Sequence, residues 1–340
     1  MMDYRLYTGA YTNGQPGEAV ALWRFDGSAL TELWRVGGLR NPSYVLPQGK
    51  RLYAVEELSD WAGLACFSWE EDAAPKLLWH RQVPGAGLCH LALSGPVLYA
   101  SGYDGGALTG VEAASGEPCC FREFYGCGPN AARQEKAHVH SCGESPDGTR
   151  LLVADLGTDR LYQFLLQAGG GLTPDPNQPW TQTEPGQGPR HFAFHPNGRW
   201  LYLVTELDRS LLVYRYEGHR LQRVEEYSLL EAADPEDSLA ADIHLTEDGR
   251  FLYVSVRGPD CLYCFQVEED GASLKQLGRF STEGGCPRNF SLSPDGRFVA
   301  VANQQPGTLV IFSRDGTTGL LGEVCCQAPA PQVSCVKWGT

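Results

Sequence analysis

The chain has 340 residues, of which 42% are hydrophobic, and its 27 basic and 41 acidic side chains give a net charge of −14. This apolar content excludes a generally disordered chain, and the acidic balance argues against a nucleic-acid-binding protein, which needs a basic surface. No stretch approaches the ~20 apolar residues of a membrane-spanning helix, and the first residues lack the apolar core of a signal peptide. We therefore expect a cytoplasmic protein with neither a membrane nor a nucleic acid as partner.

The composition favours strands and turns over helices. Glycine (40) and proline (22) are abundant, and 8 Trp, 15 Tyr and 13 Phe supply residue types that are enriched in strands. Without a secretory signal, the twelve cysteines are interpreted as reduced thiols. Cys261 and Cys264 form a Cys-x-x-Cys motif, but on a strand they would face opposite sides and bind a metal poorly. No motif demands a metal or an organic cofactor, so we predict none.

One turn motif recurs along the chain. Each copy lies between two segments with the alternation of strands, and a third and a weaker fourth segment follow. The copies are 46–49 and 94–96, both degenerate, then Ser145-Pro-Asp-Gly148, His195-Pro-Asn-Gly198, Thr246-Glu-Asp-Gly249 and Ser293-Pro-Asp-Gly296. Four strands in each repeat of about 49 residues are typical of a propeller blade, and the chain accommodates seven such repeats.

The two ends of the chain carry the parts of one divided repeat. Residues 5–9 and 19–25 match a second and a third strand, whereas residues 333–338 match a first strand with nothing after it. We predict that the last strand completes the N-terminal blade, because this closure removes two exposed sheet edges. The expected fold is all-β: one domain, residues 1–340, forming a seven-bladed β-propeller of four-stranded antiparallel blades.

Antiparallel pairing also predicts where polar side chains meet. Residues about eight positions before and after each turn glycine lie side by side at the opposite end of the blade, around the central channel. These positions hold, from the looser to the clearer repeats, Glu57, Tyr103, His140 with Asp155 nearby, Arg190, Glu206, Arg257, Arg288 and Gln304. Arginines can bind a carboxylate or phosphate, and a histidine and a glutamate can move protons. We predict a pocket for a small anionic molecule with acid–base capacity.

Some assignments at this rim stay open. His138 is two residues before His140, so either histidine could face the site. Arg190 and Glu206 could be a cross-strand ion pair without a chemical role. His191 alternates away from Arg190 and is interpreted as structural, while Asp242 is a weaker candidate for the site. The sequence does not indicate an oligomeric state.

Several short motifs are more specific than a generic propeller repeat. They are residues 134–141 with 155–160, 188–191 with 206–208, and 287–290 with 301–304. In these motifs the chain resembles the lactonase-type seven-bladed propellers, a family that includes the bacterial propeller-type 6-phosphogluconolactonase and the fungal carboxy-muconate cycloisomerase. The resemblance covers essentially the whole chain.

The resemblance implies both a site and an activity. The catalytic residues it implies are His140 (or His138), Arg190, Glu206 and Arg257, which the strand pairing also brings together; His138, Arg288, Glu57, Tyr103, Asp155 and Gln304 are the expected substrate contacts. The implied reaction is hydrolysis of an anionic sugar lactone, such as 6-phosphogluconolactone. His140 or Glu206 would activate water, Arg190 and Arg257 would stabilise the oxyanion, and Arg288 would hold a phosphate or carboxylate. A lactone-forming cycloisomerase and a non-enzymatic ligand- or protein-binding propeller are the alternatives.

Overall fold

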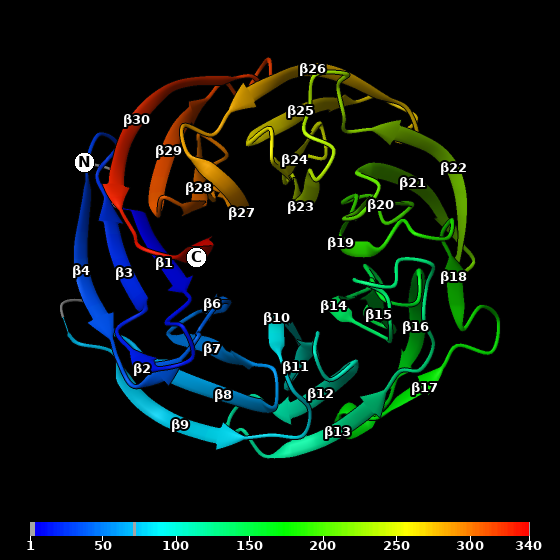
Figure 1. Ribbon diagram of the computed structural model, residues 1–340, viewed down its shortest axis with the longest axis horizontal. Coiled ribbons are helices and arrows are strands. Elements are labelled where there is room, and N and C mark those ends of the chain that lie inside the picture. Colours follow the sequence, from blue (N-terminus) through cyan, green and yellow to red (C-terminus); the bar gives the residue numbers. More distant parts are fainter. Residues whose placement is uncertain (1–3, 71–72, 340) are drawn as a thin grey trace.

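Residues 4–70 and 73–339, which the computed structural model describes, form seven antiparallel sheets arranged in a ring around a central axis (Figure 1). Six sheets have four strands in a row, and in the seventh the outer place is divided between two short strands. The predicted seven-bladed propeller is therefore confirmed. No helix in the described part of the chain is long and apolar enough to cross a membrane.

The blades that are continuous in the sequence each begin with their innermost strand (Figure 1). Their strands are β6 (Val45–Gln48), β7 (Arg51–Leu58), β8 (Trp61–Ser68) and β9 (Lys76–Gln82); β10 (Leu88–Ser94), β11 (Val97–Gly102), β12 (Ala107–Glu112) and β13 (Pro118–Glu123); β14 (Val139–Glu144), β15 (Arg150–Asp155) and β16 (Arg160–Leu166), with β17 (Leu172–Pro174) and β18 (Trp180–Gln182) both paired to β16; β19 (Pro189–Phe194), β20 (Trp200–Thr205), β21 (Ser210–Glu217) and β22 (Arg220–Ser228); β23 (Leu239–Leu245), β24 (Phe251–Arg257), β25 (Cys261–Val267) and β26 (Leu274–Ser281); and β27 (Gly285–Leu292), β28 (Phe298–Gln305), β29 (Thr308–Arg314) and β30 (Leu321–Pro329).

The remaining blade is built from both ends of the chain. Its order is β31 (Val333–Trp338), β1 (Tyr4–Ala10), β3 (Val20–Phe25) and β4 (Leu30–Val36), and Thr8 pairs with Val336. The predicted closure by the C-terminal strand is confirmed. A two-stranded ribbon, β2 (Pro16–Gly17) with β5 (Leu39–Arg40), and the 3₁₀ turn η1 (Ala168–Gly170) lie outside the blades.

The repeated turn has a physical reason for its sequence. In four copies the glycine adopts a positive φ: 68° at Gly148, 70° at Gly198, 76° at Gly249 and 69° at Gly296. Only glycine adopts this conformation without steric cost. In the first of these turns, the Asp147 carboxylate accepts hydrogen bonds from the Ser145 hydroxyl (2.6 Å) and the Thr149 amide (3.1 Å). The motif thus fixes the register of each hairpin. The register in turn determines which side chains lie at the opposite end of the blade.

At that opposite end, the innermost strands share a β-bulge. The register slips by one residue at Cys89 in β10, His140 in β14, Arg190 in β19 and Arg288 in β27. Strand β23 slips between Ala240 and Ile243, and β31 slips at Ser334 against β1. A bulge bends its strand and re-aims one side chain. The ring therefore directs one side chain from each of these strands at the channel by the same backbone device.

Candidate active site

A polar cavity of about 370 Å³ lies at the mouth of the channel where the innermost strands begin. Its lining comes from several blades and consists of Glu57, Cys89, Tyr103, Asp104, Arg133, His140, Glu206, Arg257 and Arg288. Six of these residues are among the predicted site residues. Pairing between first and second strands explains their convergence, because β7, β11, β20 and β24 end where β10, β14 and β27 begin.

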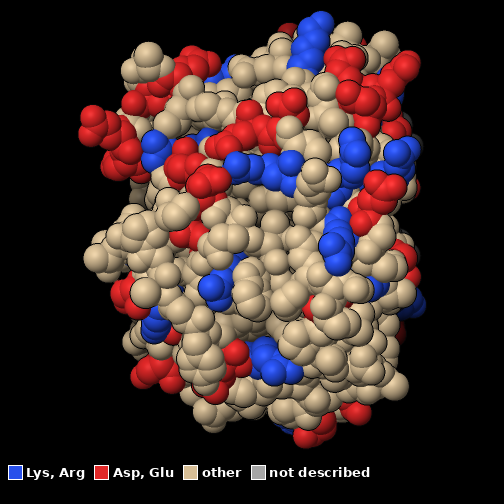
Figure 2. Space-filling model, turned by 90° about the vertical axis from the view of Figure 1, so that its right-hand side faces the viewer, with Lys and Arg blue, Asp and Glu red and all other residues tan. Residues whose placement is uncertain are grey.

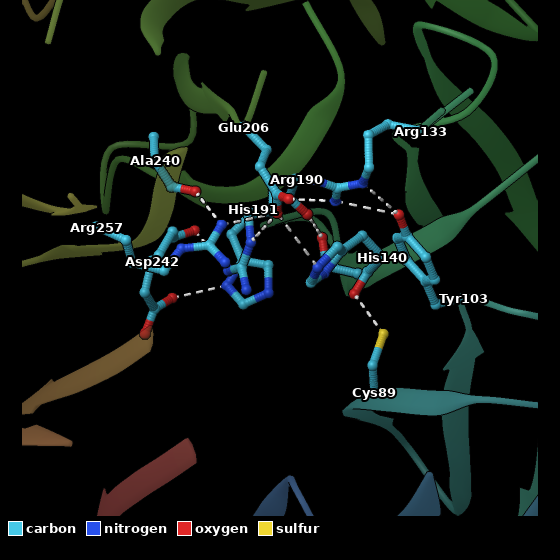
Figure 3. A network of polar contacts seen from close by, with 12 residues as sticks. Cys89, Tyr103, Arg133, His140, Arg190, His191, Glu206, Ala240, Asp242 and Arg257 are labelled. Atoms are coloured by element: carbon cyan, nitrogen blue, oxygen red, sulfur yellow. Dashed lines mark hydrogen bonds and ion pairs between the residues drawn. The ribbon is translucent and has the colours of Figure 1, made fainter. Parts of the chain in front are cut away.

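The Glu206 carboxylate is the centre of the site's polar network (Figure 3). Its Oε1 accepts a hydrogen bond from Arg133 Nη2 at 2.5 Å, and its Oε2 accepts one from Arg190 Nε at 2.7 Å. Arg257 Nη2 lies 3.1 Å from the same Oε2, and His140 Nε2 lies 3.7 Å from it. The Glu206 side chain is only 3% exposed, so these contacts replace water almost completely.

These surroundings set the protonation of the two acid–base candidates. Burial alone would raise the pKa of the Glu206 carboxyl, but the charges of Arg257 and Arg190 hold that pKa well below its usual range. Burial, together with the charge of Arg190, holds the pKa of the His140 imidazole well below its usual range. At neutral pH, Glu206 is therefore an ion and His140 is a neutral base.

Arg190 occupies a different place from the other site arginines. Its side chain is 2% exposed, and its Nη1 donates a 2.6 Å hydrogen bond to the Ala241 carbonyl while its Nε holds Glu206. It lines a narrow space deeper in the channel, and it is not part of the lining of the 370 Å³ cavity. The structure therefore places Arg190 beneath Glu206, where it fixes the carboxylate.

Arg288 faces the cavity without an acidic partner. Within residues 4–70 and 73–339, no carboxylate lies within 4.0 Å of its guanidinium, which sits 5.6 Å from the centroid of the Tyr11 ring. The nearby Glu57 carboxylate accepts hydrogen bonds from Tyr11 (2.9 Å) and from the Ser43 hydroxyl. Burial raises the pKa of Glu57 despite the charge of Arg288. Arg288 is thus a half-buried cation that no described carboxylate contacts directly, although the negative charges of Glu57 and Glu206 act on it.

The other predicted contacts lie away from the cavity wall. His138 stacks on Tyr103, with 4.3 Å between ring centroids, and its ring nitrogens contact the Tyr103 carbonyl and Glu135. Asp155 is fully buried and accepts hydrogen bonds from the amides of His138 and Gly157, so it fixes the loop after β15. Gln304 contacts the Cys286 thiol. Of the two candidate histidines, His140 lines the cavity.

Three residues of the lining were not among the predicted site residues: Arg133, Asp104 and Cys89. Arg133 lies in the loop before β14, which has no counterpart in the other repeats, so counting from the turn glycines cannot reach it. Its guanidinium also contacts the Tyr103 hydroxyl at 3.2 Å. Asp104 directly follows Tyr103, which was predicted to line the site, and this adjacency in the sequence could have indicated that Asp104 lines it too.

The charge of the site opposes that of the protein. Around the cavity and just beneath it, the described chain places four arginines (Arg133, Arg190, Arg257 and Arg288) against the carboxylates of Glu57, Asp104 and Glu206. The chain as a whole carries −14, and on the outer face in Figure 2 basic side chains lie among acidic ones. The arginines outnumber the carboxylates here, so the channel mouth is locally more positive than the chain as a whole. The arrangement combines anion binding with a neutral proton acceptor.

Comparison with known proteins defines this propeller as an enzyme of the lactonase class. The chain belongs to the family described as Lactonase, 7-bladed beta-propeller, whose model matches residues 5–338. The predicted family resemblance is confirmed.

Individual relatives support the same conclusion. A Bacillus subtilis (strain 168) protein named 6-phosphogluconolactonase is 31% identical, with 99% of each chain covered. A Formosa agariphila protein of the same name is 33% identical over 93% of this chain and 94% of its own. The solved structure of a Pseudomonas aeruginosa periplasmic gluconolactonase superposes with a TM-score of 0.91 at 30% identity, covering 100% of this chain and 99% of the other. The comparisons favour lactone hydrolysis over cycloisomerisation and over a non-enzymatic propeller.

Proposed function

We propose that this protein hydrolyses 6-phosphogluconolactone, the lactone of a phosphorylated sugar acid. The observation that carries the proposal is the pairing, in one cavity, of a neutral buried His140 with an arginine, Arg288, that has no carboxylate partner in the described chain. The cavity volume of about 370 Å³ is in the range of small-molecule sites. The names of the relatives support this choice of substrate.

His140 is the proposed general base. Its imidazole is neutral, lines the cavity and can take a proton from the attacking water. Glu206 is poorly suited to that step, because both of its oxygens already accept charged hydrogen bonds and its pKa is strongly depressed. We assign Glu206 instead to holding the neighbouring cations and His140 in place.

The oxyanion of the tetrahedral intermediate is assigned to Arg257, with Arg133 beside it. Both guanidiniums line the cavity and are already fixed by Glu206, so they need little reorganisation when negative charge develops. Arg190 then acts as a positioning residue through Glu206, which differs from the direct oxyanion role that the family resemblance implies. When the intermediate collapses, the ring oxygen leaves and takes the proton from His140.

Arg288 is the proposed phosphate contact. A guanidinium forms bidentate hydrogen bonds with phosphate, and this one is held by the Tyr11 ring without being neutralised. In this proposal, Arg288 is the residue that makes the enzyme prefer a phosphorylated lactone over its unphosphorylated analogue.

A cytoplasmic location belongs to the same proposal. All twelve cysteines lie in the described residues and are free thiols, which is typical of a reducing compartment. Subcellular fractionation of the native host checks it, and recovery of the protein outside the cytoplasm would contradict it.

The test compares hydrolysis of freshly generated 6-phosphogluconolactone and of unphosphorylated gluconolactone, after subtraction of the spontaneous rate. We expect His140→Gln to lower kcat on both lactones by about 10²–10⁴-fold. Arg288→Met should raise KM for the phosphorylated lactone and leave the other lactone nearly unchanged. Arg250→Met, which removes a surface arginine paired with Asp248, is the matched control. Absence of enzyme-dependent hydrolysis by the wild type would refute the proposal, and an equal effect of Arg288→Met on both lactones would refute the phosphate assignment.

A further inference from the structure

The channel continues beyond the candidate active site to a second cavity of about 270 Å³ at the other mouth of the ring. That cavity is lined by the later parts of the innermost strands, including His191, Asp242, His244 and Lys337. Between the two cavities lies a narrow space of about 10 Å³, whose wall includes both His140 and His191. The two histidines thus link the two mouths of the channel.

A chain of titratable side chains leads from His140 to the second mouth. The rings of His140 and His191 meet edge to face, with 5.2 Å between their centroids. His191 Nδ1 hydrogen-bonds to Asp242 Oδ1 at 2.7 Å, and His244 Nε2 hydrogen-bonds to Asp242 Oδ2 at 2.9 Å. Figure 3 shows His140, His191 and Asp242 in this order. The His244 side chain is 28% exposed, so the chain ends at solvent.

One junction in this chain has the properties of a water site. His140 Nδ1 and His191 Nε2 are both buried, and neither has a hydrogen-bond partner in the part of the chain that the structure describes. The narrow space that both residues line matches the volume of about one water molecule. A water there would accept from one imidazole and donate to the other, which satisfies both nitrogens.

We infer that His191, Asp242 and His244 form a proton relay that returns His140 to its neutral state after each turnover. The inference rests on the proposed lactone hydrolysis. In that reaction the acyl carbon gains a hydroxyl from water, the acyl carbon–ring oxygen bond breaks, and the ring oxygen gains a proton. The product carboxylic acid then ionises, so one proton is released per turnover. His140 returns the proton that it took from water to the ring oxygen. In the proposed relay it then takes the second proton, from the product carboxylic acid, and must lose that proton before it can act as a base again.

The charges around His191 favour passage of a proton over its retention. Arg190 and Lys337 face it with positive charge, His90 packs against its ring at 5.2 Å, and Asp242 is the acidic partner. Burial and the charge of Arg190 lower the pKa of His191 to about 4. The Asp242 carboxylate is also held by the Asn289 amide, which keeps it directed at both histidines. On the substrate side, by contrast, the proton would have to leave past three cavity-lining arginines.

A purely structural role of the His191–Asp242 pair is the competing explanation, and buffer rescue separates the two. Glutamine at 191 or 244 can still donate to Asp242 but cannot pass a proton. We expect His191→Gln and His244→Gln to lower kcat in dilute buffer by about 10²-fold, and added imidazole to restore it at constant pH and ionic strength. Wild type and His219→Gln, a surface histidine beside Asp147, should not respond to imidazole.

The assay is enzyme-dependent proton release, with the imidazole-catalysed blank subtracted and folding checked by circular dichroism. The relay is overturned if His244→Gln, at the partly exposed end, keeps wild-type kcat in dilute buffer. It is equally overturned if folded variants lose activity that imidazole does not restore at any concentration. An inactive wild type would instead overturn the lactonase proposal and the relay together, so the two failures are distinguishable.

Discussion

Replacing Glu206 by glutamine tests whether this carboxylate stabilises the site against the repulsion of its own arginines. The substitution keeps the shape and removes the charge that Arg190 and Arg257 contact at 2.7 and 3.1 Å in an almost fully buried setting. Breaking a buried ion pair by removing one partner costs about 3–5 kcal/mol. We expect Glu206→Gln to lower the free energy of unfolding by this amount. The ion pair with Arg133 adds nothing to the figure, because the Arg133 side chain is 33% exposed and solvent screens the pair.

The assay is urea unfolding at 25 °C and pH 7, with wild type and Glu206→Gln side by side. Glu32→Gln is the matched control, since Glu32 forms a bidentate pair with Arg35 at 2.7 Å but on the surface, where a loss below about 1 kcal/mol is expected. A loss for Glu206→Gln no larger than that of the control would refute the reasoning.

The pH dependence of this difference supplies a second check. The pKa of folded Glu206 is depressed, so its stabilisation is present above the unfolded value of about 4.3 and is lost as pH falls through the folded value. The difference between the two proteins should therefore stay constant from pH 5 to pH 8 and shrink in more acidic buffer. A difference that grows on acidification would contradict the assignment of an ionised Glu206.

The remaining predictions concern stability, turnover and ring closure. The pKa of His191 is about 4 in the folded protein and about 6.5 in the unfolded chain, so the unfolded chain binds the proton first as pH falls. The free energy of unfolding, measured in urea, should therefore fall by about 2 kcal/mol between pH 7.5 and pH 5 because of this residue. In His191→Gln the fall in the free energy of unfolding should be smaller by that amount. Arg190→Met should lower kcat on the lactone more than it raises KM, because Arg190 acts through Glu206 below the cavity; a pure KM effect would contradict this. Deleting residues 333–340 removes the buried side chains of Val333, Val336 and Trp338, each of which stabilises the fold by about 1.5–3 kcal/mol. The truncated protein should therefore lack the cooperative thermal unfolding transition of the wild type, and a transition at the wild-type temperature would contradict this.

Much of the fold and part of the site could be predicted because the turn glycines act as fixed reference points. Antiparallel pairing is periodic, so counting from Gly198 to Glu206 or from Gly148 to His140 locates both residues at the channel mouth. The divided blade was predictable for the same reason, because each chain end matches a different part of one repeat.

Other features depend on contacts that a repeat does not encode. Arg133 enters the site from a loop without an equivalent in the other blades. Arg190 sits at a counted position and shares its bulge with His140 and Arg288, yet its hydrogen bonds to the Ala241 carbonyl and to Glu206 hold its side chain below the cavity. The choice between His138 and His140 follows from the stacking of His138 on Tyr103, which is a contact between blades. Periodicity predicts which end of a blade a residue occupies, while packing decides where its side chain goes.

The shared β-bulge separates the architecture of the ring from its chemistry. The slipped positions are occupied by unlike residues, namely Cys89, His140, Arg190, Arg288 and Ser334, although the backbone device that presents them is the same. Exchanging one of these side chains leaves the ladder hydrogen bonds of its blade intact, since the bulged residue is unpaired. The same backbone feature thus presents residues of different chemistry, and the side chain at each slipped position, not the ladder, determines what the channel can bind or catalyse.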